Sequence, residues 1–154
     1  SRGWCLSLGA DYVINHHDNM IEQFQQQALA NPDYILCLNS TDDHFKTMSE
    51  LIAPQGMICS IVETLQSHDL DELKSKSAGF VWEFMFTRSM YKTADRIKQH
   101  DLLNSIAELI DSGEIKTTLK EVFGQMTVEN IRKAHEQLEA GSTIGKIVLT
   151  KIDK

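Results

Sequence analysis

Two short apolar runs, at residues 34–38 and 57–62, flank a segment of helical spacing and constrain the fold of this chain most. Each run is continuous and ends in polar residues, which is typical of a strand buried on both faces. The segment between them is long enough for a crossover helix, so we expect a right-handed parallel β-α-β unit over residues 33–63. Its helix begins near Thr41-Asp42-Asp43, which offers a capping side chain and acidic residues for the positive end of the helix dipole.

Ligands of open α/β sheets bind at the carboxyl ends of the strands. In this unit the two strand ends are Asn39-Ser40-Thr41 and Ser60-Ile61-Val62-Glu63. These residues are therefore the first candidates for a binding site.

The rest of the chain predicts an alternation of helices and strands. A first helix stops at Gly9, and Pro32 closes the helix predicted at residues 20–29, because proline disfavours helix in the residue before it. Residues 64–79 are polar and predict a loop with one short helix. The other predicted elements are strands at 12–14, 80–87, 116–123 and 145–150 and helices at 90–112 and 127–138, the last capped by Thr127.

Composition excludes several classes of partner. A net charge of −7 over 154 residues argues against nucleic acid and against an anionic membrane surface. No apolar run approaches the ~20 residues of a membrane span, and no leader suggests secretion. The three cysteines, Cys5, Cys37 and Cys59, are odd in number and widely spaced, so we expect reduced thiols in a cytoplasmic protein.

Short catalytic motifs do not identify an activity. The sequence has no G-x-G-x-x-G after a strand, no phosphate loop of the G-x-x-x-x-G-K type, no G-x-S-x-G elbow and no Tyr–Lys pair with short-chain dehydrogenase spacing. His16-His17 allows a metal site or a solvated loop, and neighbouring residues of an extended chain point to opposite sides. The acidic residues Asp42, Asp43, Asp69, Asp71 and Glu72 allow paired carboxylates, or helix caps on a solvated face.

The aromatic residues Trp82, Phe84 and Phe86 recur with period two. On a strand their rings would share one face. That face is either part of the core or belongs to an edge strand that pairs with another subunit.

The order of several short motifs resembles that of the medium-chain dehydrogenases and reductases. Residues 8–15, LGADYVIN, are similar to the family's LGAD-x-VI-N stretch, and residues 134–141 followed by 145–149 are similar to its closing signature. Asp111-Ser112-Gly113 and the run at 84–88 lie between them in the family's order. The branch that the chain resembles is the zinc-type alcohol dehydrogenase-like one, near the quinone oxidoreductases, and the resemblance covers essentially the whole chain.

The resemblance implies an α/β fold: a partial Rossmann-type parallel sheet with flanking helices, lacking the first two strands, plus a C-terminal helix-strand tail. Residues 1–91 would be a partial dinucleotide-binding domain, and residues 92–154 a segment that returns to the catalytic domain. Strands would follow the order 12–14, 34–38, 57–62, 80–86, or the open edge would recruit another chain. Because the GroES-like catalytic domain would precede this chain, we assign it no catalytic residue and no metal ligand, and we expect no zinc in this portion.

By position, the resemblance also implies a cofactor and a partner. The longer parent would use NADP (or NAD), and weak or no binding is expected here because the Gly-rich loop is missing. A homodimer would form through the strand from Phe80 to Thr87, and the parent would act on a small-molecule substrate. The implied cofactor-binding residues are Asn39, Ser40, Ser60, Ile61, Val62, Phe84, Met85 and Phe86.

Two functions therefore stay open. The first is the cofactor-domain portion of an NAD(P)H-dependent oxidoreductase that reduces a quinone, enone or carbonyl by hydride transfer and is not active alone. The second is a non-catalytic α/β module for dimerisation or partner binding.

Overall fold

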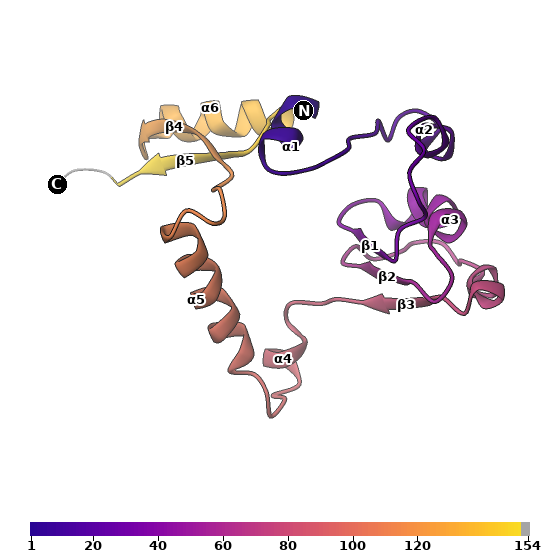
Figure 1. Ribbon diagram of the computed structural model, residues 1–154. Helices are drawn as coiled ribbons and strands as arrows, with labels where there is room; N and C mark the ends of the chain where they lie inside the picture. The colour runs from indigo at the N-terminus through magenta and orange to yellow at the C-terminus, as the bar shows by residue number, and fades with distance from the viewer. Residues whose placement is uncertain (152–154) are drawn as a thin grey trace. The chain divides into compact units, whose positions relative to one another are not determined.

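The computed structural model describes residues 1–151 of the chain. It divides into two compact units, one of residues 14–96 and one that joins residues 1–13 to the chain from residue 97 onward. Each unit contains its own parallel sheet (Figure 1). The chain is therefore an α/β fold with parallel sheets, as the sequence predicted.

Three parallel strands organise the unit of residues 14–96. They are β1 (Tyr34–Cys37), β2 (Met57–Ser60) and β3 (Gly79–Trp82), in the order β1-β2-β3. Helix α3 (Thr41–Leu51) connects β1 to β2, which confirms the parallel β-α-β unit of the sequence. A 3-10 helix, η1 (Leu70–Lys76), lies in the connection from β2 to β3, within the segment predicted as a loop with one short helix.

One face of this sheet forms the core. In register, Ile35, Ile58 and Phe80 stand side by side on that face. The buried core residues are Cys37, Phe45, Met48, Ile52, Ile58 and Leu73. Because Phe45, Met48 and Ile52 come from α3 or its end and Leu73 from η1, these two helices cover the face.

The opposite face contradicts the prediction of strands buried on both sides. Tyr34 is 83% exposed, Leu36 61% and Leu38 58%, and Met57 and Val81 beside them are also exposed. Within the unit of residues 14–96 no helix covers this face of β1, so its continuous apolar run is buried on alternate residues only.

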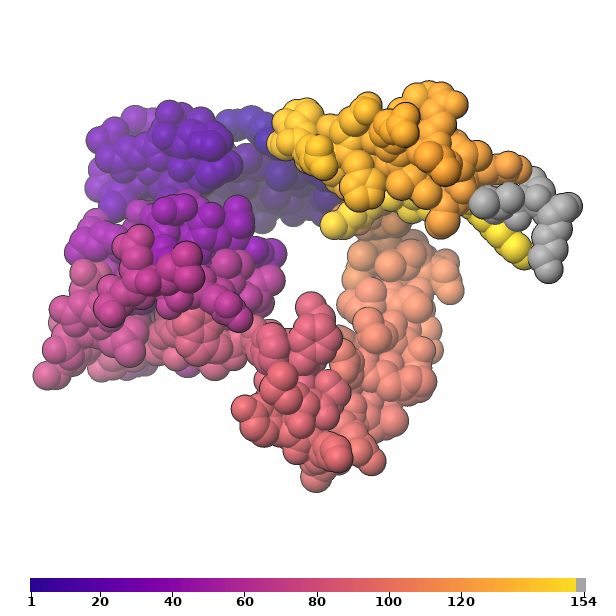
Figure 2. All heavy atoms as spheres, turned by 180° about the vertical axis from the view of Figure 1, so that it is seen from behind, coloured from indigo at the N-terminus to yellow at the C-terminus, as the bar shows by residue number. Residues whose placement is uncertain are grey.

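The strand predicted at residues 12–14 is also wrong. Residues 12–15 have no regular structure, and the described sheet begins with β1. The side chain of Gln23 in α2 (Met20–Gln26) takes both backbone groups of Asn15, accepting its N–H at 2.7 Å and donating to its carbonyl at 2.8 Å. These bonds satisfy backbone groups that a sheet ladder would otherwise hold. In the space-filling view the α2 region (violet) lies directly against the α3 region (magenta) (Figure 2).

The long helix predicted at residues 90–112 forms only in the second part of that range, because residues 91–97 are not helical. Helix α4 (Thr87–Met90) ends in a turn at Lys92, whose φ is +50°, and α5 (Lys98–Asp111) follows. Asp95 fixes the turn by accepting hydrogen bonds from Thr93 Oγ1 at 2.7 Å and Arg88 Nε at 3.2 Å. The periodic apolar residues predicted one continuous helix because their spacing gives no sign of the turn that Asp95 holds.

The second unit is built around a parallel pair of strands. Its elements are α1 (Arg2–Ser7), α5, β4 (Leu119–Gln125), α6 (Val128–Glu139) and β5 (Lys146–Thr150). Figure 1 shows α6 along the β4–β5 pair. Thr127 caps α6 by accepting the Asn130 N–H at 3.2 Å, as predicted, and Lys120 lies 5.5 Å from the ring centroid of Trp4. No helix among residues 1–151 is long and apolar enough to span a membrane.

Candidate functional site

The carboxyl ends of β1, β2 and β3 meet at one edge of the sheet. The strand ladder continues one residue past each end, because Ile61 N–H bonds the Cys37 carbonyl at 3.2 Å and Glu83 N–H bonds the Ser60 carbonyl at 2.9 Å. The segments that leave this edge carry the residues that the sequence singled out. Parallel α/β sheets bind ligands at this edge.

Asn39 and Ser40 form the turn between β1 and α3. Asn39 is exposed, and its carbonyl accepts a hydrogen bond from the Cys37 thiol at 3.2 Å. Ser40 has a left-handed backbone, with φ +48° and ψ +57°, and precedes the first residue of α3. Its side chain makes no capping hydrogen bond, so the backbone turn alone starts the helix.

Thr41 does not cap α3, contrary to the sequence prediction. Its side chain is fully buried and turns toward β2. Thr41 Oγ1 lies 2.6 Å from Ser60 Oγ and 2.6 Å from the carbonyl oxygen of Val62. Ser60 is also fully buried and its carbonyl accepts the Glu83 N–H, whereas Ile61 is exposed and Val62 half-buried.

Asp42 holds the loop that follows β2. Its Oδ2 accepts the Leu65 N–H at 2.8 Å, and its Oδ1 lies 2.6 Å from His68 Nε2. The Leu65 N–H, followed by the His68 ring, holds the pKa of the Asp42 carboxyl below its usual range. His68 stacks on Phe45 of α3, with ring centroids 4.6 Å apart.

Phe84, Met85 and Phe86 leave the third strand as a turn. The strand expected from Phe80 to Thr87 ends at Trp82, and Thr87 N–H closes the turn on the Phe84 carbonyl at 3.0 Å. All three side chains are exposed, and the rings of Phe84 and Phe86 meet edge to face at 5.4 Å. The period-two aromatic face therefore stops with the pair of Phe80 and Trp82, whose rings lie 5.0 Å apart.

A cavity of about 450 Å³ lies beside β1 on the side of α2 and α3. Its walls are mainly apolar, with Phe24 and Met48 among them, and Asn39, His16 and His44 also line it. His16, His17 and His44 do not form a metal centre: the His16 and His17 rings are tilted by 41° with centroids 4.0 Å apart, and the ring centroid of His44 lies 6.3 Å from that of His16. No group of three His, Cys, Asp or Glu residues in the described chain could hold a metal ion.

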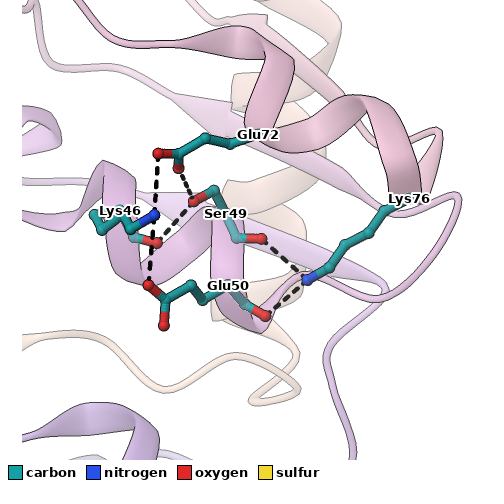
Figure 3. Close-up of polar contacts among 5 residues, drawn as sticks. All are labelled: Lys46, Ser49, Glu50, Glu72 and Lys76. Carbon is teal, nitrogen blue, oxygen red and sulfur yellow. Dashed lines mark hydrogen bonds and ion pairs between the residues drawn. The ribbon is translucent and has the colours of Figure 1, made fainter.

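Asp69 and Glu72 of the predicted acidic cluster make hydrogen bonds that hold the fold together. Asp69 caps η1 by accepting the Asp71 N–H at 2.9 Å. Glu72 accepts from Ser49 Oγ at 2.5 Å and from Lys46 Nζ at 3.0 Å, and these two donors lower its pKa (Figure 3). These contacts tie η1 to α3 and leave no paired carboxylates for acid–base chemistry at this position.

The sequence singled out five of the eight candidate residues as strand ends, and the other three followed from the resemblance alone. It missed the roles of Thr41 and His68. The available signal for Thr41 was its place as a polar residue at the start of the helix that follows β1. His68 lies in a segment without periodicity, and only the fold brings it to Asp42.

Comparison with known proteins relates most of the chain to one family. A family model described as zinc-binding dehydrogenase matches residues 8–149. A zinc-type alcohol dehydrogenase-like protein of Staphylococcus aureus strain MSSA476 is 43% identical over 146 residues, which are 95% of this chain and 44% of that protein. This chain thus spans less than half the length of such relatives.

Solved structures agree. A protein of Rhizobium etli CFN 42, provisionally described as a zinc-dependent alcohol dehydrogenase, superposes with a TM-score of 0.83 at 33% identity, covering 99% of this chain and 44% of that one. A quinone oxidoreductase of Pseudomonas syringae pv. Tomato DC3000 shares the fold, with a TM-score of 0.71 at 17% identity over 96% of this chain and 45% of that one.

Proposed function

The chain belongs to the zinc-binding dehydrogenase family, and from this premise we propose that it is the C-terminal cofactor-domain portion of an NAD(P)H-dependent oxidoreductase. The observation that supports this most is the shared edge of β1, β2 and β3, from which Asn39, Val62 and the turn at residues 84–86 all leave. Residues 1–91 would belong to the cofactor domain, and residues 92–154 would return to a catalytic domain.

The residues at this edge suit a nicotinamide nucleotide in part. Exposed apolar side chains at Ile61, Phe84 and Phe86 suit a flat ring, and Asn39 and Ser40 suit the polar adenosine side. When bound, the nicotinamide supplies the hydride, while the protein orients the ring and excludes water. The 154 residues contain no Gly-rich loop for the pyrophosphate, so this site would be one wall of a larger one.

Zinc does not fit the described residues. They offer no set of ligands for it, so no step of the proposed reaction uses a metal held by these residues. The substrate class that we propose is a quinone, enone or carbonyl, reduced by hydride transfer. Its support is the likeness to alcohol dehydrogenase-like proteins in sequence and to a quinone oxidoreductase in fold. Cys5, Cys37 and Cys59 are free thiols, which supports the cytoplasm as the place of action that we propose.

A second candidate is a non-catalytic module that dimerises or binds a partner. It is favoured by β3, which pairs only with β2 within residues 1–151. Val81, Trp82 and Phe84 are exposed on or just after this strand. A homodimer across residues 80–87 is compatible with either function.

Two measurements test the proposal. The coding DNA upstream of Ser1 should contain, in frame, a GroES-like domain and a strand with a Gly-rich turn; an in-frame stop codon directly upstream would contradict the oxidoreductase. Calorimetric titration of NADPH into the 154-residue chain should give weak or no binding. Sub-micromolar affinity would show that the chain forms a complete cofactor site by itself.

A further inference from the structure

We propose that Thr41 and Asp42, neighbours in the first turn of α3, are positioning residues that hold the loop after β2 where it faces the nicotinamide. The loop is residues 61–68, and the two side chains bond it at Val62, Leu65 and His68. We call these contacts of Thr41 and Asp42 with the loop the clasp. The link to the nicotinamide rests on the proposed function, whereas the clasp itself rests on these contacts.

The proton positions at Thr41 follow from the chemistry of its partners. A carbonyl oxygen only accepts, so the Thr41 hydroxyl donates to the Val62 carbonyl at 2.6 Å. Its single proton is then used, and the Ser60 hydroxyl donates to Thr41 Oγ1 at 2.6 Å rather than to the Cys37 carbonyl at 3.4 Å. Ser60 Oγ in turn accepts the Val62 N–H at 3.4 Å. Both backbone polar groups of Val62 are therefore bound by this pair of hydroxyls.

Because the two hydroxyls are buried, their hydrogen bonds fix the orientation of the Val62 backbone. Thr41 and Ser60 are both 0% exposed, so water does not compete for their hydroxyls. A buried hydroxyl without its partner is costly, and the pair therefore favours one position of the Val62 backbone over its neighbours. An apolar contact of the same size would bury similar area without fixing the orientation of that peptide.

Asp42 fixes the other end of the loop. The two oxygens of its carboxylate bind different segments, Oδ2 the Leu65 N–H and Oδ1 the His68 ring. Asp42 and His68 are only 18% and 17% exposed in their side chains. Asp43, the next residue of α3, makes no such contact with residues 61–68 in the described chain, so the clasp belongs to residues 41 and 42.

In the first turn of α3, the side chains of Thr41 and Asp42 thus bond the loop and not the backbone of their own helix. Side chains of this kind at a helix start commonly accept N–H groups of the same helix. Here Ser40 makes no such bond and Thr41 points away from the helix. The start of α3 therefore holds the loop after β2, which we assign to the cofactor, in place.

Amide hydrogen exchange on the 154-residue chain tests the clasp without any ligand. In Thr41→Val the Val62 amide should exchange at least tenfold faster, while Thr41→Ser, which keeps the hydroxyl, stays within threefold of wild type. Asp42→Ala should accelerate Leu65 at least tenfold, and Asp43→Ala, its matched control, should not. Equal acceleration at Ile58 in β2, or no acceleration at Val62 and Leu65, would overturn the clasp.

An NMR titration with NADPH to 20 mM tests the link to the cofactor. Amide shifts should appear at residues 61–65 in the wild-type chain, and Thr41→Val should weaken the apparent affinity at least threefold while Thr41→Ser restores it. Equal affinity in Thr41→Val would overturn the positioning role. Shifts that appear only outside residues 61–65 would overturn the assignment of this loop to the cofactor, and the exchange result decides by itself whether the clasp exists.

Discussion

The ammonium group of Lys76 lies 2.7 Å from the carbonyl oxygen of Glu50 at the carboxyl end of α3 (Figure 3). The same nitrogen donates to the carbonyls of Ser49 at 3.0 Å and Ile52 at 2.9 Å. The last carbonyls of a helix lack partners within it and carry its negative end. Lys76 of η1 therefore caps the carboxyl end of α3. The amino end of the same helix holds the loop after β2.

Replacing Lys76 with Met should destabilise this unit. The change removes three charge-assisted bonds but keeps the aliphatic stem, so we expect a loss of about 1–2 kcal/mol in the free energy of unfolding. Urea unfolding followed by circular dichroism measures it. The control is Lys74→Met, because Lys74 is an exposed lysine of the same 3-10 helix whose side chain makes no described bond. Equal losses in both variants would contradict the role of Lys76.

Gly56 is required by packing before β2. A Cβ at this position would lie 2.7 Å from Ile52 Cδ1 and 2.8 Å from the carbonyl oxygen of Asp33. Gly56→Ala should therefore cost about 1–3 kcal/mol, because backbone cannot move aside as a side-chain tip does. Gly3→Ala is the control, since nothing lies within 4 Å of its would-be Cβ. In thermal melts, Gly56→Ala should have a lower melting temperature than wild type and Gly3→Ala should not. A wild-type melting temperature for Gly56→Ala would refute the close approach of Ile52 and Asp33 to Gly56.

The stability of residues 14–96 should fall in acid through Asp42. Its pKa is below the ordinary value of 3.8 in the folded chain, because the Leu65 N–H and the His68 ring favour the carboxylate. A lowered folded pKa means that the unfolded chain binds the proton first. The contribution is thus fully present above about pH 4 and is lost as pH falls through the folded pKa.

Melting temperatures from pH 7 down to pH 2 for wild type and Asp42→Asn measure this contribution. The variant should melt lower at pH 7, and the gap between the two should close in acid. Asp43→Asn is the matched control and should keep the wild-type profile. A gap that is constant with pH would argue against the charge of Asp42 as its source.

Local patterns predicted the β-α-β unit because its two strands are short continuous apolar runs and the segment between them has helical spacing. Thr41 shows where such reasoning ends. A threonine before two aspartates at a helix start favours a cap, and its actual partners, Ser60 and Val62, lie 19 and 21 residues later in the chain. Only the pairing of β1 with β2 brings them together, so the clasp could not be predicted from spacing.

The edge of β3 should mediate a homodimer if the second proposal for this surface holds. Phe84→Lys places a charge among exposed rings next to Phe86, so it should shift the chain to monomers. Sedimentation velocity at micromolar concentration measures the state. Leu65→Lys is the matched control, because Leu65 is 96% exposed in a loop of the same unit. An unchanged sedimentation coefficient in Phe84→Lys would count against the dimer.

Burial was the property that sequence predicted least well. The run at 34–38 is as apolar as a strand covered on both faces, yet Tyr34, Leu36 and Leu38 are exposed. An apolar pattern reports what a residue could bury against and not what lies next to it. The same limit explains the unpaired segment at 12–14 and the next residue, Asn15, whose backbone groups bond the side chain of Gln23 and not a strand.

The uncovered face of the first sheet should govern the solubility of the chain. Tyr34, Leu36, Met57 and Val81 present apolar area from all three strands, and patches of this kind drive association more strongly in sulfate. Ammonium sulfate should therefore raise light scattering well before the far-ultraviolet spectrum changes, whereas Leu36→Glu should delay that onset. The exposed face of the sheet thus limits the solubility of the chain, whereas the core on the opposite face sets its stability against unfolding. Colloidal stability and conformational stability are therefore separate quantities for this chain.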